Sequence, residues 1–109
     1  MKQVNVLGTM YTVDEVKKSE DANLVNMDGY CDTSIKKCVV DNMQETDENS
    51  KANLPEYKKS VIRHELIHAF LYESGLDSCC YWAKEEALVD WLAIQFPKLQ
   101  KAFEEAGCL

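Results

Sequence analysis

Residues 61–70 read VIRHELIHAF, and this short stretch does most to decide the fold. It contains the pattern H-E-x-x-H, made by His64, Glu65 and His68, and it holds both histidines of the 109-residue chain. On an α-helix, positions i and i+4 lie one turn apart on one face, so both imidazoles can reach the same ion. We therefore expect a helix here that holds one metal ion.

Glu65 has a different place in this pattern. It is rotated about a third of a turn from His64, which brings its carboxylate near a metal-bound water rather than to the metal itself. Neutral imidazoles suit Zn²⁺, which lowers the pKa of its water to about 7. Glu65 would accept that water's proton as the water attacks a carbonyl, and would later deliver it to the leaving amine.

Apolar residues surround the two histidines on the helical wheel, namely Ile62, Leu66, Ile67, Phe70 and Leu71. This spread predicts a central helix that is buried around most of its circumference. Two histidines beside a carboxylate are costly to bury without a partner, which favours a metal site. The alternative is a pair of core histidines that are satisfied by hydrogen bonds alone.

A catalytic zinc site needs a third protein ligand besides an open position. Because the chain has no other histidine, this ligand is a carboxylate or a cysteine. Glu86 and Asp90 share one face of the next expected helix, where Glu86 could bind the metal and Asp90 could accept a hydrogen bond from a histidine N–H. Glu85 is expected to be solvated near the helix start. The rival ligands are Cys79 and Cys80, in the connecting loop.

The sequence before the motif has strand character. Residues 4–7 and 10–13 predict two short strands joined by a bend at Gly8. Residues 30–32 and 37–40 predict a second hairpin. Across this hairpin, its two cysteines, Cys31 and Cys38, could face each other.

Helical periodicity follows a polar, solvated loop at residues 41–55. We expect helices over 56–74, 83–96 and 98–106, where Pro97 suits the first turn of the last one. Strands followed by helices indicate an α+β fold. The chain is thus expected to be one domain over residues 1–109. Its small antiparallel or mixed sheet of three to four strands would precede an active-site helix, a ligand-bearing helix and a short C-terminal helix.

Composition limits the classes of function. The chain is 46% apolar and 28% charged, which suits one compact domain. A net charge of −7, with Arg63 as the single arginine, argues against a nucleic-acid partner. The N-terminus does not read as a signal peptide, and no run is long enough to span a membrane. Five cysteines, an odd number, make a poor disulfide framework. We expect a cytoplasmic protein that binds neither nucleic acid nor membrane.

HELIH, followed after seventeen residues by Glu86-x-x-x-Asp90, resembles the gluzincin clan of zinc metallopeptidases. Over residues 60–99 the chain is similar to short metallopeptidases of phages and Firmicutes and to minimal gluzincins. The resemblance implies a zincin-like fold and hydrolysis of peptide bonds in a protein or peptide substrate. It also implies one catalytic Zn²⁺ held by the two histidines and Glu86, with Glu65 as general base and Asp90 orienting His64.

The resemblance also concerns the substrate. In that clan an edge strand lines the cleft and pairs with the substrate main chain. The strand expected here is residues 37–42, with Val39, Val40 and Asp41 as substrate-binding residues. Larger gluzincins use an additional histidine or tyrosine to stabilise the oxyanion. Tyr72, one turn beyond His68, is the candidate here, and the alternative for it is a core or rim tyrosine.

Two other hypotheses remain open. The chain could be a metal-holding, metallopeptidase-like binding module of a phage or mobile element that acts through a protein partner with little or no catalysis. The acidic stretch 41–53 and the lack of a second oxyanion residue favour this alternative. The other hypothesis is latency, in which Cys108 caps the zinc as a thiolate. The sequence leaves the oligomeric state open.

Overall fold

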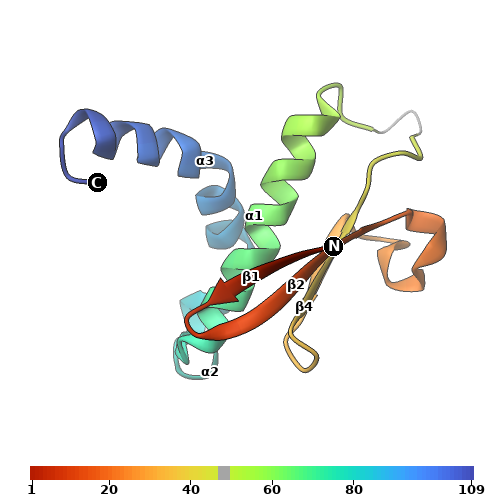
Figure 1. Cartoon of the computed structure of the whole chain (residues 1–109), viewed down its shortest axis with the longest axis horizontal. Helices are drawn as coiled ribbons and strands as arrows, with labels where there is room; N and C mark the ends of the chain where they lie inside the picture. Colours follow the sequence, from red (N-terminus) through yellow and green to blue (C-terminus); the bar gives the residue numbers. More distant parts are fainter. Residues whose placement is uncertain (47–49) are drawn as a thin grey trace.

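The computed structural model of the chain describes residues 1–46 and 50–109. It has the expected α+β fold, in which a four-stranded mixed sheet is followed by helices (Figure 1). Part of the expected loop at residues 41–55, namely residues 47–49, lies outside the described residues. The strands are β1 (Lys2–Val6), β2 (Thr9–Val16), β3 (Gly29–Asp32) and β4 (Lys37–Asp41). The helices are α1 (Leu54–Glu73), α2 (Leu76–Cys79) and α3 (Glu86–Glu105), and the 3₁₀ turns are η1 (Lys18–Glu20), η2 (Ala22–Leu24) and η3 (Tyr81–Lys84).

The sheet has the strand order β1-β2-β4-β3. β1 and β2 form an antiparallel hairpin, turned at Leu7 and Gly8, where both backbones have positive φ angles of 51° and 94°. Two successive positive φ angles are the pattern of the tight turns that suit the twist of a hairpin. β3 and β4 form a second antiparallel hairpin, and β2 pairs with β4 in parallel. The sheet is therefore mixed, one of the two arrangements expected.

The expectation that residues 37–42 form an edge strand is wrong. β4 lies inside the sheet, paired with β2 on one side and β3 on the other, and its Val39, Val40 and Asp41 are buried. A continuous apolar run is typical of a strand that is covered on both faces and both edges. The edge strand on this side is β3, which is short and only half-buried along its length.

Helix α1 packs against the sheet and forms the core with it (Figure 1). Ala69 belongs to the buried cluster with Val6, Tyr11, Val13 and Cys38. The buried stripe of α1, at Val61, Glu65 and Ala69, follows the spacing i, i+4, i+8 and faces one direction. This stripe is narrower than expected, since Phe70 is exposed and Ile62 and Leu66 are half-buried against the core.

The boundaries of α1 follow local signals in the sequence. The side chain of Asn53 accepts a hydrogen bond from the backbone N–H of Glu56, and Pro55 lies in the first turn. Gly75 follows the helix with a φ of 84°, in the left-handed region that often ends a helix. The expected helix over 56–74 is therefore confirmed to within two residues.

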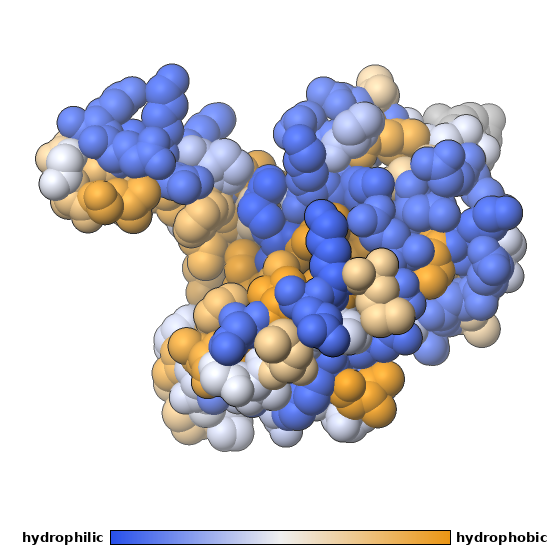
Figure 2. Space-filling view, viewed as in Figure 1, coloured by the Kyte–Doolittle hydropathy of each residue, from blue (hydrophilic) through white to orange (hydrophobic). Residues whose placement is uncertain are grey.

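The expected second and third helices are a single helix, α3, with Pro97 inside it. The first two residues of the expected second helix, Ala83 and Lys84, belong to the 3₁₀ turn η3 instead. Only Val89 and Ala93 of α3 are buried. The C-terminal half of α3 extends away from the sheet and from α1, to the left in Figure 1. Figure 2 shows apolar surface along the lower side of this projection.

In the described residues, no helix is both long enough and apolar enough to cross a membrane.

Candidate metal centre

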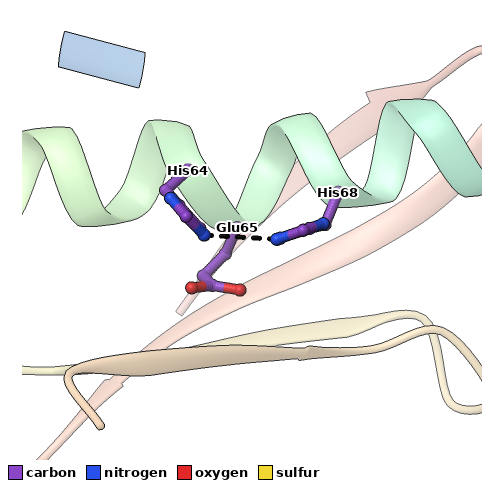
Figure 3. Close-up of side chains that lie close together, drawn as sticks. All are labelled: His64, Glu65 and His68. Carbon is purple, nitrogen blue, oxygen red and sulfur yellow. Dashed lines mark hydrogen bonds between the residues drawn. The ribbon is translucent and has the colours of Figure 1, made fainter. Parts of the chain in front are cut away.

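The two histidines lie on one face of α1 with their rings turned toward each other (Figure 3). Their Nε2 atoms are 3.2 Å apart, and the ring centroids are separated by 4.9 Å. Both side chains are largely covered, with 15% of His64 and 21% of His68 exposed. The spacing i, i+4 on a helix that is fixed by its core stripe produces this arrangement directly.

Glu65 lies between the histidines and the sheet (Figure 3) and is only 7% exposed. Burial raises the pKa of its carboxyl from 4.5 to about 7. The neighbouring His64 opposes this rise, while the carboxylates of Glu86 and Asp90 add to it. His64, Glu65 and His68 each offer a ligand atom within 4.8 Å of the others, so this group could hold a metal ion.

Glu65 is buried because β3 passes close to α1 at Gly29. A Cβ atom at this position would lie 3.0 Å from Cγ1 of Val61 and 3.3 Å from Cγ of Glu65. A larger residue here would be in tight contact with both side chains, so that one of them or the strand would have to shift. Gly29 therefore lets the edge strand close over the carboxylate.

Helix α3 brings Glu86 and Asp90 to the histidines. The Glu86 carboxylate contacts both rings, with Oε2 2.8 Å from Nε2 of His64 and Oε1 3.0 Å from Nε2 of His68. Oδ1 of Asp90 lies 3.0 Å from the other ring nitrogen of His64, Nδ1. These are the two acids that the sequence places beside the motif. Their roles as metal ligand and orienting group remain predictions.

The other expected ligands lie elsewhere. Glu85 is exposed at the N-cap of α3. Cys79 and Cys80 lie at the end of α2 and just after it, with sulfur atoms 3.6 Å apart. The sulfur of Cys108 contacts the carbonyl of Phe103 at the end of α3, and the structure does not bring it to the histidines.

A cleft of about 970 Å³ surrounds the histidines, between α1, β3 and the start of α3. Its lining includes Gly29, Tyr30 and Cys31 of the edge strand, whereas Val39, Val40 and Asp41 are buried and do not line it. Cys31 pairs directly with Cys38 in the register of β3 and β4, so these two thiols do face each other. The continuous apolar run of β4 and the glycine that begins β3 are the signals that could have identified the edge strand.

Tyr72 also lines the cleft, and its side chain is exposed. The ammonium group of Lys36 lies 4.9 Å from the centre of its ring, where a cation is attracted by the ring face. Lys36 is itself fixed by Glu73, at 2.8 Å. The structure thus places Tyr72 at the rim of the site, and its role toward an oxyanion remains a prediction.

No family model matches the chain, and comparison with curated proteins and with solved structures likewise finds no match. The resemblance to gluzincins therefore depends on the motif, and membership of that clan remains a prediction.

Proposed function

We propose that this protein is a zinc-dependent peptidase that hydrolyses peptide bonds in a protein or peptide substrate. The observation that carries the proposal is the double contact of Glu86, which lies 2.8 Å from one histidine Nε2 and 3.0 Å from the other. Tetrahedral zinc with ligand bonds of about 2.0–2.1 Å separates its ligand atoms by roughly 3.3 Å. The two Nε2 atoms, 3.2 Å apart, have nearly this spacing, and one oxygen of the Glu86 carboxylate could complete a set of three ligands around one zinc ion with an open position.

Asp90 supports the same assignment. Its contact with Nδ1 of His64 favours the tautomer in which this nitrogen carries the proton. The lone pair of Nε2 is then directed toward Glu86 and His68, where a metal would bind. A carboxylate behind a ligating histidine also fixes the orientation of the ring.

We assign proton transfer to Glu65. When bound, zinc supplies Lewis-acid chemistry, polarising a carbonyl and making water acidic near neutral pH. The buried Glu65 carboxylate, beside the two histidines, would take a proton from the water that attacks the substrate carbonyl. The same carboxyl then gives this proton to the amine nitrogen as the C–N bond breaks.

The edge strand β3 is the candidate for binding the substrate main chain. β3 pairs with β4 on one side, and its residues line the cleft beside the histidines. An extended peptide could add to the other edge of β3, where no strand pairs within the described residues, through main-chain hydrogen bonds that do not depend on the peptide's sequence. We assign to β3 the function that the sequence suggested for residues 37–42.

The test compares wild type with Glu65→Gln and, as a control on the exposed start of the same helix, Glu56→Gln. Metal content is measured first, and cleavage of an unstructured protein such as casein second. We expect Glu65→Gln to bind zinc as wild type does and to lose activity by about a hundred- to ten-thousandfold. Glu56→Gln should retain both properties. Equal cleavage by wild type and Glu65→Gln would refute the proposal.

The exposed side of α3 favours a second candidate, a metal-holding module that acts through a protein partner. Trp91, Ile94, Phe96 and Phe103 are all exposed on this helix. Phe96 and Phe103 share a face of the helix, seven residues apart, and exposed apolar side chains that share a face often mark a protein interface. In this case Glu65→Gln would leave the biological phenotype unchanged, while substitution of the exposed aromatic residues would abolish it.

A further inference from the structure

The two acids of the candidate centre lie on a helix with few buried residues. Glu86 and Asp90 are 70% and 65% exposed, and the buried residues of α3 are Val89 and Ala93. The C-terminal half of the helix extends away from the rest of the fold (Figure 1). The position of both acids therefore depends on whatever fixes this short part of α3 against α1.

Pro97 leaves a backbone carbonyl of α3 available for such a contact. In a regular α-helix the carbonyl of Ala93 would accept a hydrogen bond from the N–H of residue 97. Proline has no N–H, so this carbonyl loses its helical donor. Ala93 is buried, and a buried carbonyl without a partner is unfavourable.

Arg63 provides the missing donor. Its Nε atom lies 2.5 Å from the carbonyl oxygen of Ala93, and this bond joins α1 directly to α3. Because the donor is charged, such a bond is stronger than one between neutral groups. Arg63 is also the single arginine of the chain and immediately precedes His64.

The bond lies close to the candidate centre on both helices. On α3, Ala93 lies three residues after Asp90 and seven after Glu86, which puts all three on one face of the helix. On α1, Arg63 is adjacent to the residue that both acids contact. A hydrogen bond at this point limits both the sliding and the rotation of α3 against the histidines.

We propose that Arg63 is a positioning residue, which holds Glu86 and Asp90 against the histidines through the Ala93 carbonyl that Pro97 leaves free. Its effect on metal binding rests on the proposed function. Its effect on the placement of α3 can be measured without metal.

The experiment uses Arg63→Met, which retains an apolar stem and removes the donor, and Arg63→Lys, which retains a cationic donor. Lys59→Met removes a positive charge elsewhere on α1 and is the control. Zinc affinity is measured by competition with a chromophoric chelator. Hydrogen exchange of residues 86–96 is measured in the metal-free protein.

We expect Arg63→Met to bind zinc about 10- to 100-fold more weakly, as when the groups that orient a metal ligand are removed. It should also speed amide exchange in residues 86–96. Arg63→Lys should recover part of both losses, and Lys59→Met should behave as wild type. Wild-type zinc affinity in Arg63→Met would overturn the proposal.

Pro97→Ala separates positioning from simple stabilisation, because it returns an N–H to the Ala93 carbonyl. In the double variant Arg63→Met/Pro97→Ala, the carbonyl is satisfied within α3, while the bond between the helices remains absent. We expect the thermal unfolding midpoint to recover and the zinc affinity to stay low. Recovery of both together would show a merely structural role and overturn the proposal.

The two proposals fail in different ways. If wild type binds no zinc, the proposed function fails, and the exchange measurement alone decides on Arg63. Faster exchange of residues 86–96 in Arg63→Met would then still support its positioning of α3, and unchanged exchange would overturn it.

Discussion

The two halves of the candidate centre are built in different ways. On α1, the two histidines and Glu65 are largely covered, on a helix that packs across the sheet and contributes Ala69 to the core. On α3, Glu86 and Asp90 are mostly exposed, on a helix with two buried residues. The first half is positioned by the core itself, and the second is positioned by contacts with the first.

This difference shows what each half can contribute. Residues on the packed helix keep their relative geometry with or without an ion, because the backbone that carries them is held by the sheet. Residues on the exposed helix gain order when an ion joins them to the histidines. Metal binding is therefore expected to stabilise α3 more than α1.

The largest effects should come from removing ligand atoms. We expect His68→Ala to weaken zinc binding on the order of a thousandfold or more, because a preformed donor is lost from the packed half. Glu86→Gln should weaken it on the order of a hundredfold, since the amide oxygen of Gln can still act as a weaker donor at this exposed position. Titration with a competing chelator measures both.

Glu85→Gln is the matched control for Glu86→Gln, since it removes the neighbouring carboxylate at the exposed start of α3. Its zinc affinity should equal that of wild type. If Glu85→Gln had the larger effect, the third ligand would be assigned wrongly.

Glu65→Gln tests the cost of burying a carboxyl in the packed half. Burial raises the pKa of Glu65 from 4.5 to about 7, so between these values the folded protein holds a proton that the unfolded chain releases. The free energy of unfolding of metal-free wild type therefore falls as the pH rises through this window. Glu65→Gln should be more stable than wild type by up to about 3 kcal/mol at pH 8, with little difference at pH 4.

Chemical denaturation in the presence of a chelator at both pH values measures this change. Glu56→Gln, on the exposed start of α1, controls for the loss of a carboxylate. The same stability difference at pH 4 and pH 8 would contradict the account of Glu65.

Among the substitutions expected to weaken zinc binding, which are His68→Ala, Glu86→Gln and Asp90→Asn, the last should have the smallest effect. It retains the shape of the side chain and removes the charge that orients His64, so we expect a 10- to 100-fold loss of zinc affinity without a change of fold. Asp77→Asn, which also removes a carboxylate from the cleft lining, is the control. A loss as large as that of His68→Ala would indicate that Asp90 binds the metal itself.

The same two halves differ in how well the sequence predicts them. The helix that carries the histidines is predicted to within two residues, because its periodicity, its N-cap at Asn53 and its terminal Gly75 are all local signals. The strands are also found, since alternation and turn residues mark them. The i, i+4 spacing puts His64 and His68 on one face of their helix, and it puts Glu86 and Asp90 on one face of the next. The expectation that the two acids lie beside the histidines follows from this spacing.

What the sequence does not predict depends on contacts between distant residues. The order of strands places β4 inside the sheet, and a hairpin pattern alone does not specify on which side the next strand adds. Pro97 is locally a signal for a helix start, and it is tolerated inside α3 where Arg63 supplies a donor from another helix.

The central claim is tested most directly by a crystal structure of the zinc-loaded protein, with the ion located by its anomalous scattering. The account predicts one zinc ion bound by Nε2 of His64, Nε2 of His68 and the Glu86 carboxylate, with Glu65 nearby and not bonded to it. A cysteine or Glu65 as the third ligand, or no ion at the histidines, would contradict it.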